Sequence, residues 1–488
     1  MATATIVLRD EVNIQINGLS AETRRRLSKQ FSYDIPGARF TPAVRLGRWD
    51  GKTTYFTLSG STFVNLLPEI LPVLEEEKYE VTLDDQRQYD LIEFEFEQIN
   101  EDSFNHITWP KGHQLAGQPI KLRDYQVDAV NKGLFNPQSI HALATGAGKT
   151  LITAALSQRC EKYGRTFVIV PNKTLIGQTE ADYRNLQLDV GVYYGDRKEF
   201  GHKHTICTWQ SLNVLLKSTK AGNAEITIQE FVAGVCCVII DECHMATAAV
   251  LKDLLCSIFS KCQIRWGLTG TIPKEMFEFR SLQVSLGEVV NKIQASELQE
   301  SGVLANCHVN ITQMIDYVEY KEWQDELKYL LDTEVRQQWI AGLIEKISIT
   351  GNTLVLVDRI EPGKKIASFI PDAVFVSGTT KSGDRQEQYD DIAISSNKVL
   401  IATYGIASVG LNVPKLHNVV LIEPGKSFVR VIQSIGRGLR KAEGKDGVTI
   451  WDICSTTKYS KRHLTKRKEF YREADYPFTI KKHDWQGK

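Results

Sequence analysis

The stretch ATGAGKT, residues 144–150, decides the fold of this chain. It stands between the apolar run SIHAL, residues 139–143, and the segment LITAALSQRC, residues 151–160. The apolar run predicts a buried strand, and the following segment predicts a helix. A glycine-rich turn at such a junction directs backbone N–H groups at one point, where the dipole of the helix adds positive potential. The stretch therefore predicts a phosphate-binding loop.

Within this loop, Lys149 is expected to contact the β and γ phosphates of ATP, and the Thr150 hydroxyl is expected to bind Mg²⁺. The GxxxxGK[ST] pattern has glycine where this chain has Leu143, so the motif is irregular and a chance turn of this composition is the alternative. The strand and helix context favours the nucleotide. We expect ATP and Mg²⁺ as cofactors, with the nucleotide held by Thr145, Gly146, Ala147, Gly148, Lys149 and Thr150.

The run VIIDECH, residues 238–244, carries the second element of this chemistry. Its Asp241 and Glu242 follow an apolar run, where carboxylates are rare unless a cation meets them. We expect Asp241 to hold Mg²⁺ and Glu242 to polarise the attacking water. A buried ion pair is the alternative.

Apolar runs of strand length surround these two motifs in two series. The first comprises SIHALA, TFVIV, HTICTW, CCVIID and IRWGLTG, and the second, from residue 353, comprises TLVLVD, AVFVSG, KVLIAT, NVVLIEP and VTIWDI. Consecutive apolar positions are typical of parallel strands buried on both faces. Strands that alternate with helical segments predict two doubly wound parallel-sheet α/β domains in tandem. The joining segment, residues 290–350, contains a stretch whose apolar spacing is helical.

Composition limits the location and the partners. The chain has 488 residues, 24% of them charged and 42% apolar, which is typical of a globular protein with several domains. It has no membrane-length apolar run and no signal-peptide pattern, so we expect a cytoplasmic protein with no membrane partner. Nine cysteines occur without a CxxC pair, and we expect them to be buried and reduced. His202, His204 and Cys207 match no common zinc spacing. The formal net charge is zero, so any nucleic-acid site must be local.

Two further motifs fit around a nucleotide. KLRDYQ places Gln126 ahead of the phosphate loop, where its amide can donate to and accept from an adenine edge; a surface glutamine is the alternative. QSIGRGLRK places Arg437 and Arg440 on one face of a segment if that segment is helical. Arginines that a second domain brings to the γ-phosphate stabilise the transition state of hydrolysis, whereas arginines in surface salt bridges are the alternative.

Taken together, these motifs resemble the ordered set of a superfamily 2 helicase core, over about residues 120–452. RDYQ is similar to the adenine-recognition motif, ATGAGKT to motif I, VIVPNKTLIGQ to motif Ia, CTWQSL to motif Ic, DECH to motif II and LTGT to motif III. LVLVDRI is similar to motif IV, ATYGIASVGLNVP to motif V and QSIGRGLR to motif VI. The resemblance implies two RecA-like domains that close on ATP and Mg²⁺ and track one nucleic-acid strand.

The resemblance also assigns roles to individual residues. It implies that Thr269 and Thr271 couple the nucleotide state to domain motion, and that His244 and Gln433 act across the ATP cleft. Gly410 is implied to let the backbone approach the strand or the nucleotide. The implied backbone-phosphate contacts, which position a strand without reading its sequence, are Thr208, Gln210 and Thr403. DECH rather than DEAD favours a translocating DNA motor over an RNA clamp.

The flanks of the core are expected to select the substrate. Residues 1–110 predict a small α+β domain, in which GARFTPAVRLGRWDGKTTYF, residues 37–56, combines basic and aromatic side chains around an Asp-Gly hairpin signal. Phosphate contact and base stacking need this combination, so we expect Arg48, Trp49 and Lys52 to bind DNA; the alternative is that Trp49 fills the core of the domain. The stretch resembles the N-terminal domain of phage UvsW-type helicases. That family unwinds and branch-migrates forks, Holliday junctions and R-loops, moving 3′ to 5′.

The predicted organisation is an N-terminal DNA-binding domain over residues 1–110, RecA-like domains over 111–295 and 296–455, and a basic C-terminal helix or tail over 456–488. The last segment either binds phosphate or packs on the second RecA-like domain. We predict a monomeric ATP-dependent DNA helicase that remodels branched DNA in replication, recombination and repair, with RNA–DNA hybrids as further partners, in the host cytoplasm if a phage encodes it. The alternatives are the motor subunit of a restriction or nuclease complex, and an ATP-gated nucleic-acid clamp or annealing factor.

Overall fold

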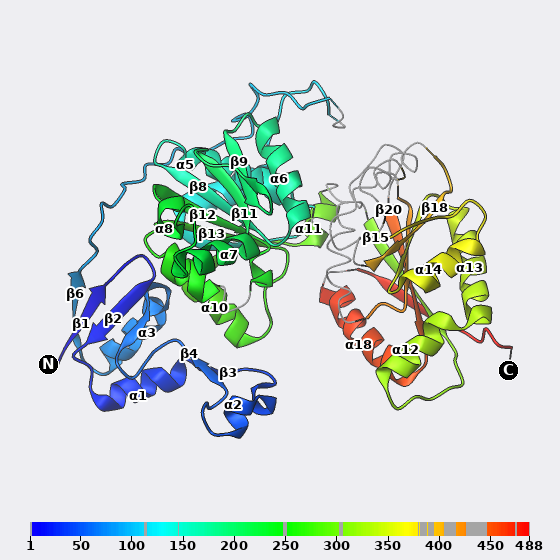
Figure 1. Cartoon of the computed structure of the whole chain (residues 1–488), viewed down its shortest axis with the longest axis horizontal. Helices are drawn as coiled ribbons and strands as arrows, with labels where there is room; N and C mark the ends of the chain where they lie inside the picture. Colours follow the sequence, from blue (N-terminus) through cyan, green and yellow to red (C-terminus); the bar gives the residue numbers. More distant parts are fainter. Residues whose placement is uncertain are drawn as a thin grey trace. The chain divides into compact units, whose positions relative to one another are not determined.

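The chain divides by its internal contacts into two units, residues 1–143 with 148–292, and residues 144–147 with 293–488. The first unit holds an N-terminal α+β region and one large sheet, and the second unit holds another large sheet (Figure 1). The computed structural model describes residues 2–111, 115–144, 146–246, 251–301, 306–378, 380, 388, 395–404, 416–425, 447–473 and 476–487. Within these ranges no helix has the length and the apolar character that crossing a bilayer needs.

The N-terminal region is a four-stranded sheet in the order β5-β2-β1-β6, packed with two helices. Its elements are β1 (Thr3–Leu8), β2 (Asn13–Asn17), α1 (Ala21–Gln30), β5 (Ser61–Phe63), the 3-10 helix η2 (Val64–Leu66), α3 (Leu67–Glu76) and β6 (Glu80–Asp85). Helix α1 begins where the Ser20 side chain accepts a hydrogen bond from the Thr23 N–H and so caps the helix. Ile14 and Ile16 are buried on one face of β2, because side chains alternate along a strand.

Between α1 and β5 the chain leaves this sheet. Strand β3 (Ser32–Asp34) pairs antiparallel with β4 (Lys52–Thr54), and residues 35–51, which we call the arm, carry the short helices η1 (Ala38–Phe40) and α2 (Pro42–Arg45) beyond the β3–β4 pair (Figure 1). The hairpin predicted around Asp50 and Gly51 is wrong. The Lys52 N–H donates to Asp50 Oδ1 at 3.0 Å and Gly51 has a φ of +79°, so the two residues do form a turn. That turn leads from the arm into β4 instead of joining two paired strands.

The large sheet of the first unit has eight strands in the order β10-β9-β11-β8-β12-β13-β7-β14. The strands from β9 to β7 pair in parallel, and β10 pairs antiparallel with β9. The strands are β7 (Gln138–Leu143), β8 (Arg165–Val170), β9 (Val190–Tyr194), β10 (Arg197–Lys198), β11 (His204–Thr208), β12 (Val235–Asp241), β13 (Ile264–Thr269) and β14 (Glu288–Ile293). The helices are α4 (Asp124–Phe135), α5 (Lys149–Cys160), α6 (Lys173–Asn185), α7 (Trp209–Lys220), α8 (Ile228–Phe231), η3 (Cys243–Met245), the π-helix η4 (Leu251–Ile258) and α10 (Met276–Leu286).

The sheet of the second unit has seven strands in the order β17-β18-β16-β19-β20-β15-β21, and all of the pairs are parallel. The strands are β15 (Asn306–Met314), β16 (Thr353–Val357), β17 (Val374–Val376), β18 (Val399–Thr403), β19 (Asn418–Ile422), β20 (Gly447–Ser455) and β21 (Phe478–His483). The helices are α11 (Ala295–Glu300), α12 (Trp323–Asp332), α13 (Glu334–Ser348), α14 (Ile360–Ser368) and α18 (Lys458–Glu473). Two doubly wound sheets in series confirm the predicted fold class.

Residues 456–488 contribute α18 and β21 to the second unit, and β21 pairs with β15 at the edge of its sheet. Helix α18 buries Leu464 and Tyr471, and its Arg467 donates to both carboxylate oxygens of Asp452 at 2.8 and 3.0 Å. Basic side chains remain on the exposed positions of the helix, at Lys461, Arg462 and Lys466. Long basic side chains can cover apolar surface and still face water, so packing of this helix leaves its predicted phosphate contact open.

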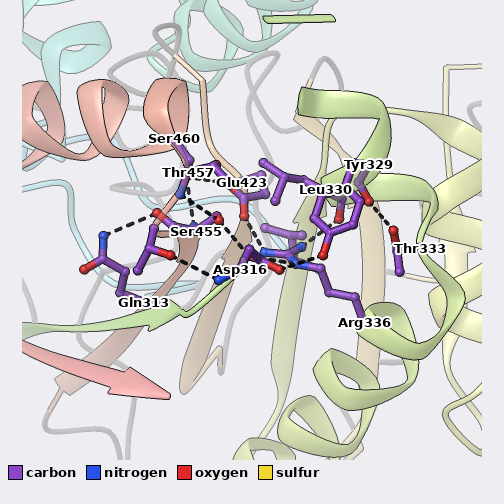
Figure 2. A network of polar contacts seen from close by, with 12 residues as sticks. Gln313, Asp316, Tyr329, Leu330, Thr333, Arg336, Glu423, Ser455, Thr457 and Ser460 are labelled. Carbon is purple, nitrogen blue, oxygen red and sulfur yellow. Dashed lines mark hydrogen bonds and ion pairs between the residues drawn. The ribbon is translucent and has the colours of Figure 1, made fainter. Parts of the chain in front are cut away.

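A buried polar network joins α13 to the sheet of the second unit (Figure 2). The Arg336 guanidinium is fully buried; it donates to Glu423 Oε1 at 2.6 Å and lies 3.5 Å from Asp316 Oδ2. The hydroxyls of Ser455 and Ser460 donate to Asp316 at 2.6 Å and to Glu423 at 2.7 Å. Burial raises the pKa of Glu423 even though the arginine opposes that shift. Because Glu423 directly follows β19, the network fixes the end of that strand against α13.

All nine cysteines are buried and free, which confirms their predicted state. His202 contacts Asp189 and His204 contacts Glu161, each at 2.7 Å, so both histidines have carboxylate partners. In the part of the chain that the structure describes, no three His, Cys, Asp or Glu side chains gather closely enough to hold a metal ion.

Candidate nucleotide-binding site

The phosphate loop follows β7 and ends at the first turn of α5, as the sequence predicts. Gly146 and Gly148 adopt φ values of +90° and +78°, which lie in the left-handed region that favours glycine. A Cβ atom on Gly148 would lie 2.4 Å from Gln126 Nε2, so a side chain there would displace the Gln126 amide in addition to straining the backbone. A glycine-rich turn at the N-terminus of a twelve-residue helix fits a phosphate group. The residues present therefore fit ATP.

Lys149 starts α5 and is held by two acceptors. Its ammonium group lies 2.9 Å from Glu242 Oε1 and donates to the Leu143 carbonyl oxygen at 3.3 Å. Leu143 is the buried last residue of β7, and it contributes a backbone oxygen here. This contact shows why the irregular first position of the motif tolerates leucine: the chain needs the carbonyl of that residue and not a positive φ.

Glu242 directly follows β12 and has a φ of +49°, which is uncommon for a residue with a side chain. Its Oε2 atom accepts a hydrogen bond from the Gly270 N–H at 3.3 Å, so the carboxylate contacts both Lys149 and the loop after β13. Burial alone would raise the pKa of the Glu242 carboxyl. The nearby Lys149 and His244 have a larger opposite effect, so the pKa is lowered. Glu242 is therefore ionised at neutral pH, as a residue that polarises water must be. The role of Gly270 was not predicted, because its N–H carries no side-chain signal.

The predicted coupling residues form one hydrogen-bonded chain. Thr269 is fully buried at the end of β13, and its hydroxyl donates to the Thr271 carbonyl oxygen at 2.8 Å. Since the single hydroxyl proton is used there, the 2.7 Å contact with His244 Nδ1 requires the imidazole to donate. His244 Nδ1 also lies 3.4 Å from Glu242 Oε2. The carboxylate of motif II is thereby linked to motif III through one imidazole.

Asp241 and Thr150, the predicted Mg²⁺ ligands, lie at the end of β12 and in the first turn of α5. Asp241 Oδ1 accepts a hydrogen bond from the Glu242 N–H at 3.0 Å, which orients its carboxylate. Oxygen donors of this kind are the ligands that Mg²⁺ prefers. The donor set therefore fits the metal, and the assignment stays a prediction.

The remaining predicted residues are placed as follows. Thr208 is buried and caps α7, where its hydroxyl accepts from the Ser211 N–H at 3.2 Å, whereas Gln210 is exposed in the first turn of the same helix. Thr403 is half-buried at the end of β18. Their contacts with nucleic acid stay predictions. Five predicted residues lie outside the described residues: Thr145, Gly410, Gln433, Arg437 and Arg440.

The arm brings the predicted N-terminal residues to the surface. Arg48 and Lys52 are exposed, and Trp49 is half-buried with its indole N–H donating to the Lys52 carbonyl oxygen at 2.8 Å. The aromatic side chains that do fill the core of the N-terminal region include Tyr55 and Phe56. Trp49 is absent from that core, so the packing alternative is not what the structure shows.

Known proteins share this architecture. Residues 119–274 match the family described as type III restriction enzyme, res subunit, and residues 335–442 match the helicase conserved C-terminal domain. The chain is 26% identical to the ATP-dependent DNA helicase uvsW of Enterobacteria phage T4, over 92% of this chain and 90% of the relative. It is 23% identical to the DNA 3′-5′ helicase XPB of Kineococcus radiotolerans, over 75% of this chain and 65% of the relative. A solved structure of the restriction-modification enzyme LlaBIII bound to DNA has the same fold, with a TM-score of 0.57 at 16% identity, over 86% of this chain and 36% of that chain.

Both halves of a helicase core are matched in their order along the chain, so the protein belongs to the superfamily 2 helicases and hydrolyses ATP. Its similarity to the phage T4 protein covers 92% of the chain and extends well outside that core. Within its class the chain is similar to a helicase of the UvsW type.

Proposed function

We propose that this helicase acts on DNA and remodels branched structures such as forks, Holliday junctions and R-loops in replication, recombination and repair. The observation that carries the proposal is the exposed basic arm in an N-terminal region that is joined to a helicase core. The relatives named as DNA helicases support DNA as the partner. The name of the XPB relative supports movement from 3′ to 5′, and RNA–DNA hybrids would be further substrates.

In this proposal the ATP site uses the described contacts directly. ATP supplies the phosphoanhydride bond whose hydrolysis drives movement. Lys149 and the glycines of the loop bind its phosphates, Thr150 and Asp241 hold Mg²⁺, and Glu242 polarises the attacking water. Gln126 lies beside Gly148, where its amide would meet the adenine. Further residues are assigned by the resemblance alone: Thr145 and Gly410 at the nucleotide, and Gln433, Arg437 and Arg440 at the γ-phosphate from the second domain.

The DNA contacts are divided between the core and the arm. We assign Thr208, Gln210 and Thr403 to the backbone of the tracked strand, which hydroxyl and amide groups can position without reading its sequence. We assign Arg48, Trp49 and Lys52 to the branch. The protein works as a monomer. Its domain boundaries are 1–110, 111–295, 296–455 and 456–488. It acts in the cytoplasm of a host cell if a phage encodes it.

The test compares ATP-dependent remodelling of a synthetic Holliday junction, a fork, an R-loop and a tailed linear duplex, for the wild type and for Lys149→Ala. We expect the branched substrates to be remodelled faster than the linear duplex, and the variant to be inactive on all four. Equal rates on branched and linear DNA would contradict the branch-migration proposal. ATP hydrolysis without displacement of any strand would instead identify an ATP-gated clamp.

The role of the arm has its own test. Arg48→Ala combined with Trp49→Ala should weaken binding to a junction, while ATP hydrolysis stimulated by single-stranded DNA should change little. Arg25→Ala serves as the control, because Arg25 is an exposed arginine of the same region on α1, outside the arm. Equal loss of junction binding and of stimulated hydrolysis would place these residues in the fold and not at the DNA.

A further inference from the structure

Two large apolar side chains on the arm face the solvent. Phe40 in η1 is 61% exposed, and Leu46 at the end of α2 is 65% exposed. The same region buries the aromatic side chains of Phe31, Tyr55 and Phe56, although Leu58 and Leu83 are also exposed outside the arm, at 59% and 67%. Apolar residues that gather on one exposed segment mark an interaction site more often than isolated ones do. The arm therefore presents apolar surface that the fold does not use.

Basic side chains surround these two residues. The stretch from Ile35 to Lys52 contains four basic residues and one acidic residue: Arg39, Arg45, Arg48 and Lys52 against Asp50. The Arg39 guanidinium lies over the Phe40 ring, 4.8 Å from its centroid. Among the described residues, no carboxylate forms an ion pair with any of the three arginines. A partner of the arm must therefore offer negative charge together with flat apolar faces, and nucleic-acid bases between phosphates offer both.

The base of the arm is fixed firmly enough to present these side chains. Tyr55, just after β4, donates to the Phe277 carbonyl oxygen at 2.9 Å, and Tyr33 in β3 accepts from Arg280 Nε at 2.9 Å. Within the arm, a Cβ on Gly51 would lie 3.2 Å from the Ala38 Cβ, so the two ends of the arm are in close contact. The β3–β4 pair is thereby attached to α10 of the first RecA-like domain.

We propose that Phe40 and Leu46 form a wedge that stacks on and unstacks the base pair at a DNA branch point, while Arg39, Arg45 and Arg48 contact phosphates of the adjoining arms. The proposal rests on the proposed function and names the residues that recognise the branch. A branch point exposes the faces of its terminal base pairs, whereas the interior of a linear duplex keeps every base face stacked. Proteins that kink DNA insert Phe and Leu between stacked base pairs at the cost of unstacking them, whereas a face that is already exposed at a branch point lowers that cost. The wedge therefore discriminates by shape and not by base sequence.

The test places 2-aminopurine, whose fluorescence rises when it is unstacked, at the branch point of a synthetic fork and measures binding without ATP. Wild-type protein should raise the fluorescence of the fork and leave a linear duplex with an interior 2-aminopurine unchanged. Phe40→Ala with Leu46→Ala should remove the rise and weaken fork binding about tenfold, in line with the loss of stacking contacts. Phe40→Trp should retain the rise, because the indole also stacks. Phe135→Ala and Leu83→Ala are matched controls, since those side chains are 86% and 67% exposed outside the arm.

The outcomes separate this inference from the function on which it rests. If the wild type remodels forks but the double variant keeps the full fluorescence rise, the wedge is refuted and the branched-DNA function stands. If the rise depends on Phe40 and Leu46 but no fork is remodelled, the wedge stands and the remodelling function fails. The absence of any rise with wild-type protein overturns the wedge directly. If circular dichroism shows that the double variant is unfolded, the single variants Phe40→Ala and Leu46→Ala are tested in its place, and the same outcomes support or refute the wedge.

Discussion

The contact between Lys149 and Glu242 predicts that one substitution will strengthen ATP binding and abolish hydrolysis together. The ammonium of Lys149 lies 2.9 Å from Glu242 Oε1, and the two side chains are only 11% and 16% exposed. A lysine that contacts the β and γ phosphates must leave this carboxylate. ATP binding therefore works against an ion pair that already exists in the protein, and Glu242→Gln removes that competitor while it preserves the size of the side chain.

The magnitude follows from the kind of contact that is lost. A hydrogen bond to a charged group contributes about 1.5–3 kcal/mol, and 1.4 kcal/mol corresponds to a factor of ten in affinity. The amide of glutamine retains an oxygen acceptor, so only part of this free energy is recovered. We expect the Kd for ATP to fall about tenfold. The same change removes the group that polarises water, so kcat should fall by about 10² to 10⁴.

The assay is a fluorescence titration with an ATP analogue, done in EDTA so that metal ligands do not contribute, together with steady-state hydrolysis in Mg²⁺. Glu180→Gln is the matched control. Glu180 is a nearly buried carboxylate on α6 that accepts two hydrogen bonds from Arg197, at 2.9 Å each, and it contacts none of the ATP-site residues described above. Its variant should leave the Kd for ATP unchanged. If Glu242→Gln binds ATP no more tightly than the wild type in EDTA, the ion pair does not compete with the nucleotide and the reasoning is refuted.

Three further predictions concern stability and the loop. Arg336→Met leaves two buried carboxylates without their cation and should lower the free energy of unfolding of the second unit by about 3–5 kcal/mol, measured by urea denaturation; a cost under about 1 kcal/mol would contradict the role of the network. Burial lowers the pKa of His141 to about 4, so the unfolded chain binds a proton that the folded protein rejects. Stability should be fully present above about pH 6.5 and fall by about 3 kcal/mol as the pH drops to 4, and His141→Phe should flatten that dependence in unfolding curves. Gly148→Ala should weaken ATP binding, because alanine resists a φ of +78° and the added Cβ would displace the Gln126 amide. Gly222→Ala, with a similar φ of +72° and open space around it, should leave ATP binding unchanged, and unchanged binding by the first variant would show that the loop can relax.

Most strands of the two large sheets could be predicted because each carries its signal locally, whereas β9, β10, β14 and β15 were not predicted. Strand β12 is a continuous apolar run up to its last residue, Asp241, because both faces of a parallel sheet are covered by helices, and Glu242 follows it directly. A continuous apolar run also predicted β7, and with it the position of the phosphate loop that follows. The edge strand β21 was not predicted, because most of its side chains are exposed and its sequence is basic. Its place depends on pairing with β15, which no local pattern records.

The contacts of the site depend on which strands are neighbours. Glu242 meets both Lys149 and the Gly270 N–H because β12 pairs with β13, which in turn pairs with β7. The residue types of the site can be predicted from the sequence, but the order of the strands in the sheet cannot. The arm shows the same limit, since the Asp50-Gly51 signal identifies a turn and cannot identify the strands on either side. Strand β4 finds its partner in β3, on the far side of two short helices.

Helix α10 joins these two parts of the molecule. It begins shortly after Thr271 of motif III, and its Arg280 donates to Tyr33 of β3 at 2.9 Å and to Glu69 of α3 at 2.7 Å. The helix also places Val284 in the core of the N-terminal region. The arm is therefore attached to the unit that carries Glu242 and Lys149, so a DNA branch held by the arm keeps its position relative to these two residues. Under the proposed function, the tracked strand must then move relative to a fixed branch point, and this is how translocation along one strand becomes branch migration.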